Sequence, residues 1–146
     1  MPSPKKILVL CTGNSCRSQI AEAYLRHFAG SRVEVYSAGI TTHGVNPGAV
    51  ATLHEDGIDI SGHTSNHVDE YRHLDFDYVI TVCDNAQEHC PLFPGSARKF
   101  HHNFPDPAKA TGTPEEIAAQ FRAVRDQIKG FCRQFTDEYV PILPTD

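Results

Sequence analysis

Apolar and polar positions follow two different rhythms along this chain. Four short runs have the apolar and β-branched content of strands: residues 7–10, 33–37, 76–82 and 97–102. Three longer stretches repeat apolar residues at helical spacing: residues 19–28, 47–56 and 114–135. Strands that alternate with helices are typical of βαβ units. The pattern therefore predicts one α/β domain over residues 1–146, with a four-stranded parallel sheet and helices on both faces.

Helix ends carry their own signals. Asn46 followed by Pro47 predicts an N-cap and a first helical position. Thr113, with Glu116 three residues later, predicts a capping box at the start of the last helix. Gly30 predicts the end of the first helix. Ligands of parallel sheets bind at the carboxyl ends of the strands, so the loops that leave those ends deserve a search for chemistry.

The first such loop, residues 11–18, reads Cys-Thr-Gly-Asn-Ser-Cys-Arg-Ser. Backbone N–H groups of a tight loop, and those of the helix that follows, can converge on one anion. Gly13 permits an unusual backbone shape, and Asn14 tolerates the left-handed region. We therefore predict that this loop binds a tetrahedral oxyanion through Thr12, Gly13, Asn14, Ser15, Cys16, Arg17 and Ser18.

Cys11 is the candidate nucleophile of this loop. The guanidinium of Arg17 offers a planar fork of donors that suits two oxygens of a phosphate-like ion. The same donors stabilise a thiolate, and the Ser18 hydroxyl could add a hydrogen bond to the sulfur. The plain alternative is that Cys11 ends a buried strand and Arg17 is a surface cation. The Gly-Lys-Ser/Thr ending of nucleotide-binding loops is absent, so nucleotide binding is not implied.

The overall composition limits the partners. The chain has 146 residues, of which 40% are hydrophobic and 21% charged, as in ordinary globular proteins. A net charge of −5 argues against nucleic acid and anionic membranes, which favour a basic face. No stretch approaches the roughly 18 apolar residues of a membrane helix, and the run at 7–10 is too short for a signal peptide. We expect a cytoplasmic protein, and no feature demands more than a monomer.

Five cysteines occupy positions 11, 16, 83, 90 and 132. In a reducing compartment, their odd count and uneven spacing argue against a disulfide framework. Some are therefore candidates for chemistry. We expect Cys16 to point away from the loop and Cys132 to have a packing role or none.

Asp106 lies between Pro105 and Pro107, on a loop that proline makes stiff. A general acid requires such positioning. The alternative is an ordinary aspartate of a turn.

The loop at residues 11–18 resembles the phosphate loop of low-molecular-weight protein tyrosine phosphatases. It equally resembles that of the arsenate reductases built on the same fold. Residues 37–39 and 57–65 also resemble this family, so the likeness covers most of the chain. It implies a flavodoxin-like topology, with Cys11 as nucleophile, Arg17 as oxyanion ligand and Asp106 as acid. Phosphate and arsenate have similar size and charge, so the loop alone does not choose between them.

Cys83 and Cys90 match the further cysteines of the arsenate reductases, in which three thiols relay the oxidation. The resemblance thus implies reduction of arsenate, with thioredoxin as reductant or glutaredoxin as the alternative. Ala108 stands where phosphatases usually have an aromatic residue, which favours a small inorganic substrate. The other interpretations are a phosphotyrosine phosphatase, a redox-sensing or arsenic-binding module, and a zinc site. Zinc would use Cys83, Cys90 and His101 or His102, but the sequence has no C-x2-C pair.

Some members of the family hold a potassium ion beside the loop. Asn14, Glu22 and Ser37 match its ligands, but the fourth position is Asn66, which lacks a charge, so we predict no firm metal site. A helix from Cys83 to Cys90 would separate their Cα atoms by about 10.5 Å. A disulfide needs them within roughly 7 Å, so we predict that this segment loops out on oxidation.

Overall fold

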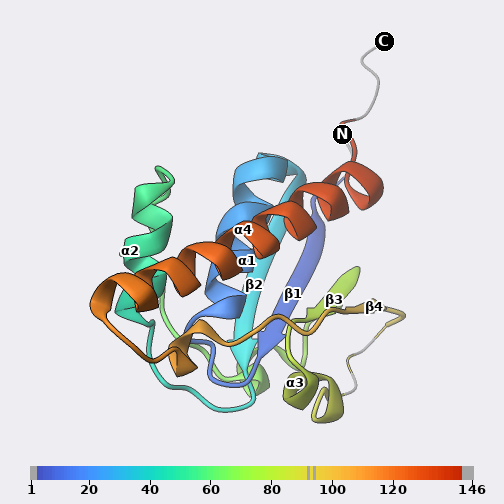
Figure 1. The fold of residues 1–146 in the computed structure, drawn as a ribbon. Coiled ribbons are helices and arrows are strands. Elements are labelled where there is room, and N and C mark those ends of the chain that lie inside the picture. The colour runs from blue at the N-terminus through green and yellow to red at the C-terminus, as the bar shows by residue number, and fades with distance from the viewer. Residues whose placement is uncertain (1–2, 92, 94, 143–146) are drawn as a thin grey trace.

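The sheet forms as the sequence predicts. The structure is a computed structural model that describes residues 3–91, 93 and 95–142 (Figure 1). Four parallel strands lie in the order β2-β1-β3-β4, which is a flavodoxin-like order. Their bounds are Lys5–Cys11 for β1, Val33–Gly39 for β2, Tyr78–Thr81 for β3 and Arg98–His101 for β4. β2 continues past the predicted end at Ser37 because Gly39 still pairs with Cys11.

Two helices begin where their predicted caps place them, whereas the first helix begins at Arg17, two residues before its expected start at residue 19. The helices are α1 (Arg17–Ala29), α2 (Pro47–Glu55), α3 (Asp84–Glu88) and α4 (Pro114–Tyr139), with 3-10 turns η1 (Gly30–Arg32), η2 (Val68–Tyr71) and η3 (Pro107–Lys109). The Asn46 side chain accepts the N–H of Gly48, and Thr113 forms the predicted capping box with Glu116. α4 extends beyond the predicted end at Phe135 because its last turn still has apolar partners. Tyr139 packs against Phe135 and Phe100.

The two faces of the sheet are covered differently. α1 and α4 cover one face, where Phe135 of α4 meets Tyr78 edge-on. On the other face, Tyr36 of β2 contacts Tyr71 of η2 and Phe76, so shorter segments cover it. Within the described residues, no helix combines the length and the apolar character needed to cross a membrane.

The central strand β1 organises the end of the sheet that carries the site. Its residues Ile7–Leu10 are fully buried, as expected for a strand with neighbours on both sides and layers on both faces. The chain passes from β1 to β2 on one side, and later enters β3 on the other. The loops after β1 and β3 therefore leave the sheet side by side, at the switch point where α/β sheets bind ligands.

Candidate active site

The Cys11 loop, residues 11–18, is held by hydrogen bonds to its backbone carbonyl groups. Every carbonyl from Cys11 to Cys16 accepts a hydrogen bond, and the donors are the N–H groups of Ile40, Thr41, His43, Asn46 and Ile20 and the side-chain amide of Gln19. Within the described part of the chain, no backbone N–H of residues 12–16 donates to another group. These amides and the positive end of α1 are available to an anion, as the sequence predicts.

Four of those hydrogen bonds come from one segment, residues 40–46, which we call the strap. The ring of His43 lies so close to Gly13 that a Cβ at position 13 would overlap it. Gly13 does not have a positive φ, so its role is this close approach and not the unusual backbone shape predicted from the sequence. The left-handed residue is Asn14, with φ 47°, as predicted.

The Cys11 sulfur is buried, and its Sγ lies 2.8 Å from Oγ of Ser18. The Ser18 oxygen accepts a hydrogen bond of 2.7 Å from Nδ2 of Asn14. Because this bond occupies a lone pair of Ser18, its own hydrogen is free to point at the sulfur. The pair is therefore oriented to stabilise a Cys11 thiolate.

Arg17 and Asp106 meet at the side of the loop. One guanidinium nitrogen of Arg17 donates to the carbonyl of Phe104 at 3.0 Å, and the other lies 3.6 Å from Oδ2 of Asp106. The other carboxylate oxygen of Asp106 accepts the N–H of Ala108 and caps η3. The structure thus brings the predicted cation and the predicted acid together, each on a fixed backbone.

Cys83 reaches the same place from β3. It is buried, and its Sγ lies 3.3 Å from Oγ1 of Thr12, the residue that follows Cys11. The Thr12 hydroxyl oxygen also accepts Nδ2 of Asn85 at 3.2 Å, which ties α3 to the loop. Cys90 lies two residues beyond α3 and is half-buried, with its Sγ 3.6 Å from its neighbour's carbonyl. The first two predicted thiols are therefore at the loop, and the third is at the far end of the short helix.

The other two cysteines have the surroundings of inert thiols. Burial, and then the negative charge of Asp106, raises the pKa of Cys16 to about 12. Burial also raises the pKa of Cys132, whose Sγ lies near the carbonyl of Ala21. Both are neutral at physiological pH, in keeping with the packing roles that the sequence suggests.

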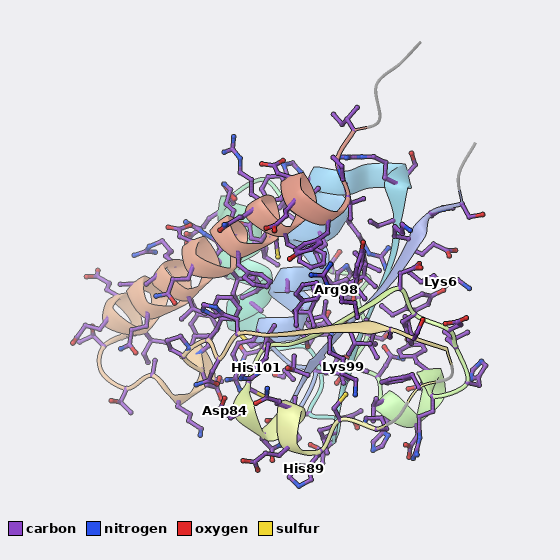
Figure 2. All side chains as sticks on the ribbon, turned by 90° about the vertical axis from the view of Figure 1, so that its right-hand side faces the viewer. Lys6, Asp84, His89, Arg98, Lys99 and His101 are labelled. Atoms are coloured by element: carbon purple, nitrogen blue, oxygen red, sulfur yellow. The ribbon has the colours of Figure 1, made fainter. Side chains whose placement is uncertain are left out.

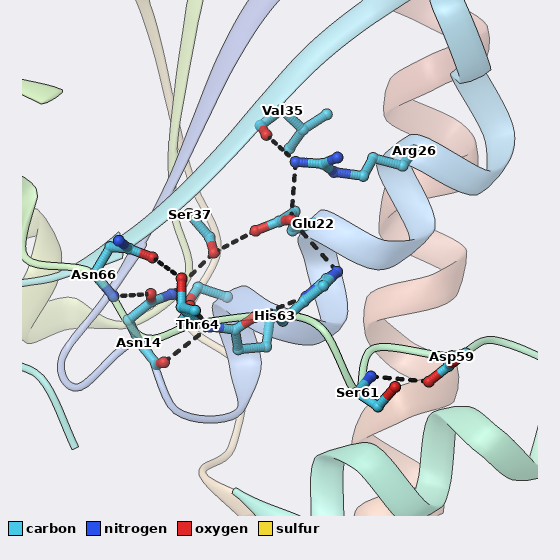
Figure 3. A network of polar contacts seen from close by, with 12 residues as sticks. Asn14, Glu22, Arg26, Val35, Ser37, Asp59, Ser61, His63, Thr64 and Asn66 are labelled. Atoms are coloured by element: carbon cyan, nitrogen blue, oxygen red, sulfur yellow. Dashed lines mark hydrogen bonds and ion pairs between the residues drawn. The ribbon is translucent and has the colours of Figure 1, made fainter. Parts of the chain in front are cut away.

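A buried polar network supports the loop from behind (Figure 3). Ser37 donates to Glu22 at 2.5 Å and accepts Nδ2 of Asn14 at 3.0 Å. Glu22 also forms an i,i+4 ion pair with Arg26, at 3.0 Å, and its carboxylate is buried. One carboxylate oxygen of Glu22 thus accepts a hydroxyl hydrogen bond from Ser37, and the other pairs with the guanidinium of Arg26.

These contacts do not fit the potassium ion that the resemblance suggests. Oδ1 of Asn14 accepts the N–H of Asn66, so Asn14 presents its amino group, not an oxygen, to Ser37. The charge of Glu22 is balanced by Arg26. The contacts do not favour the zinc alternative either. Among the residues that the structure describes, no three His, Cys, Asp or Glu side chains gather as a metal site requires. Both ring nitrogens of His101, a candidate zinc ligand, have other partners.

Sequence reasoning did not find Gln19 as a support of the loop. Its side-chain amide donates to the carbonyls of Asn14 and Thr64, and its oxygen contacts Nδ1 of His63. Gln19 is fully buried in the first turn of α1. A polar residue so close to Arg17 is the only signal of this role that the sequence offers.

Comparisons with known proteins identify relatives of this chain. The family model described as low molecular weight phosphotyrosine protein phosphatase matches residues 6–140. An arsenate reductase of Shouchella clausii is 47% identical over 137 residues, covering 92% of this chain and 97% of that protein. An arsenate reductase of Bacillus subtilis is 46% identical, covering 91% and 96%. A solved structure described as an arsenate reductase in oxidized state superposes with a TM-score of 0.76 at 30% identity, covering 89% and 95%. The chain belongs to the low molecular weight phosphotyrosine protein phosphatase family.

Proposed function

We propose that this chain reduces arsenate to arsenite through three thiols, Cys11, Cys83 and Cys90. Relatives that are arsenate reductases align over nearly their whole length, which supports this activity within the family. The observation that carries the proposal is the position of Cys83, whose Sγ lies 3.3 Å from the hydroxyl of Thr12. A phosphatase needs one cysteine and a water, whereas a reductase needs a second thiol beside the first.

The first step joins arsenic to Cys11. The thiolate attacks arsenate, which the N–H groups of residues 12–18 and the guanidinium of Arg17 hold by neutralising its charge. A sulfur–arsenic bond forms and an arsenic–oxygen bond breaks. Asp106 gives the departing oxygen a proton, so it leaves as water.

The next steps move the oxidation outward. The thiolate of Cys83 attacks Sγ of Cys11, and the electron pair of the sulfur–arsenic bond stays with arsenic, which leaves as arsenite. Arsenic has gained two electrons, and the two thiols have become the Cys11–Cys83 disulfide. Cys90 then attacks Cys83 and frees Cys11. A dithiol partner, thioredoxin in the first instance, reduces the Cys83–Cys90 disulfide. This chemistry suits a reducing compartment, so we infer a cytoplasmic location. We also infer a monomer, because the three thiols of the relay lie in one chain.

A second candidate is the hydrolysis of phosphomonoesters by Cys11, Arg17 and Asp106 alone. The family match favours it, because the family is described by its phosphotyrosine phosphatases.

One pair of assays separates these functions. Arsenite production is measured with thioredoxin, thioredoxin reductase and NADPH, and with a glutaredoxin system in a parallel arm; hydrolysis of an aryl phosphate is measured beside it. Cys83→Ser should abolish arsenate reduction and spare hydrolysis, and Cys132→Ala should leave both unchanged. Reduction that survives Cys83→Ser contradicts the relay. Tight arsenite binding without either activity would favour a sensing or arsenic-binding module.

A further inference from the structure

The edge strand β4 sends alternate side chains to opposite faces of the sheet. Arg98 and Phe100 face α4, where the Arg98 guanidinium lies 4.9 Å from the ring centre of Tyr139. Lys99 and His101 consequently face the other side. Figure 2 shows both on β4, near the short helix α3 that carries Asp84.

A cavity of about 170 Å³ lies between β4 and the end of α3. Its lining includes Lys99, His101, Gln87 and Cys90, completed by Val79, Thr81 and Phe100. The third cysteine of the proposed relay and Lys99 therefore line the same small cavity.

Further titratable groups lie on the elements around this cavity: His101, Asp84, Glu88 and His89. His101 contacts Thr81 through Nδ1 at 2.7 Å and Asp84 through Nε2 at 2.8 Å. Glu88 ends α3, and His89, which follows it, contacts the carbonyl of Asn85.

Lys99 is the cation that acts on Cys90. Among the described residues, no carboxylate lies within 4.0 Å of Lys99. Burial raises the pKa of Cys90, and the charge of Lys99 opposes that rise.

We propose that Lys99 is a positioning residue of the thiol relay, which stabilises the Cys90 thiolate that attacks Cys83. This inference rests on the proposed function. In the step concerned, Cys90 gives its proton to solvent, and its thiolate attacks Sγ of Cys83 in the Cys11–Cys83 disulfide. A Cys83–Cys90 bond forms, and Cys11 leaves as a thiolate. One disulfide replaces another, so no further oxidant or reductant is required.

Lys99→Met tests the role of the charge, because it keeps the length of the side chain. Fully reduced protein is mixed with arsenate without a reductant, quenched with acid and alkylated, and the disulfides are mapped by peptide mass. The conversion of Cys11–Cys83 to Cys83–Cys90 should slow by roughly twofold to fivefold at pH 7. A smaller fraction of Cys90 is then thiolate, and the higher nucleophilicity of that thiolate offsets part of the loss. The pH dependence of this rate should shift to higher pH. In Lys99→Arg the rate and its pH dependence should match those of the wild type. Arg98→Met, on the other face of β4, should also change neither the rate nor its pH dependence.

Alkylation of Cys90 as a function of pH tests Lys99 without arsenate. Its midpoint should rise in Lys99→Met and stay near that of the wild type in Lys99→Arg and Arg98→Met. Unchanged profiles in Lys99→Met, or equal shifts in Arg98→Met, would overturn the proposal. A wild-type protein that releases no arsenite would instead contradict the proposed function, and the alkylation profile would still decide the role of Lys99.

Discussion

The Cys11 loop and the relay segment, residues 83–90, lie side by side but are built in opposite ways. In the loop, each carbonyl from Cys11 to Cys16 has a hydrogen bond, and the side chains of Asn14 and Ser18 are fully buried. In the relay segment, α3 has five residues and only Ala86 among them is buried. Binding a charged oxyanion requires donors that are already in place, whereas passing a disulfide from one thiol to the next requires a segment that can move.

Thr12 links the two regions through its side chain. Thr12 belongs to the loop, yet its hydroxyl contacts Cys83 and Asn85 of the relay segment. Cys83 is therefore held at the loop before any oxidation occurs, while the backbone of Cys90 makes a long contact at the end of α3, where its nitrogen lies 3.5 Å from the carbonyl oxygen of Gln87. We expect changes in the loop to impair substrate chemistry, and changes in the relay segment to impair only the later exchange.

The largest effect should follow Arg17→Lys. Lysine keeps the charge but lacks the planar fork with which Arg17 bonds the Phe104 carbonyl and lies beside Asp106, and which we expect to bind the oxyanion. We expect kcat/KM for arsenate to fall by about 10²–10³, the usual cost of one preorganised oxyanion donor.

The matched measurement for Arg17→Lys is oxidation by diamide, which forms the Cys83–Cys90 disulfide without arsenate. Its rate should equal that of the wild type, since the relay segment does not use Arg17. A fall of less than tenfold in arsenate reduction, or a slower reaction with diamide, would contradict this division of labour.

Asn14→Ala should have the next largest effect, on the free energy of unfolding. The buried side chain donates to Ser18 and Ser37 and accepts the N–H of Asn66, and alanine would also take on the strain of φ 47°. Together these losses should cost about 3 kcal/mol, measured by urea denaturation.

Asn14→Gly separates the two contributions, because glycine adopts a positive φ without strain but makes none of the bonds. It should recover about 1 kcal/mol relative to alanine. Equal stabilities of the two variants would show that backbone strain at position 14 is negligible.

The sequence predicted the elements better than the contacts that hold the site. Caps at Asn46 and Thr113 are local signals, because each depends on residues two or three positions away. The use of Gly13 depends instead on His43, thirty positions later, and no periodicity connects them. The burial of Glu22 on α1 has the same origin, since its partner Ser37 lies on β2, fifteen positions later. Long-range polar pairing is what a pattern of hydrophobic positions leaves out.

The opening of the relay segment on oxidation, predicted from the sequence, stays a prediction. The observed helix, Asp84–Glu88, is shorter than the span from Cys83 to Cys90 assumed from the sequence, but it still lies between the two thiols. A disulfide between them requires Cα atoms within roughly 7 Å, so the intervening turn must open.

The smallest expected effect is the change in hydrogen exchange when this turn opens. In the reduced protein, the amides of Gln87 and His89 donate to the carbonyls of Cys83 and Asn85. Oxidation to the Cys83–Cys90 disulfide should remove these bonds and speed exchange of the two amides by about tenfold, whereas residues 6–10 of β1 should keep their protection. Cys90→Ser treated with the same oxidant is the control, because it cannot form this disulfide. Equal protection of residues 84–89 in the reduced and oxidised proteins would mean that the disulfide forms without opening α3. The contrast between a rigid loop and a mobile segment would then be wrong, and the geometry of Cys83 and Cys90 would have to change elsewhere in the fold.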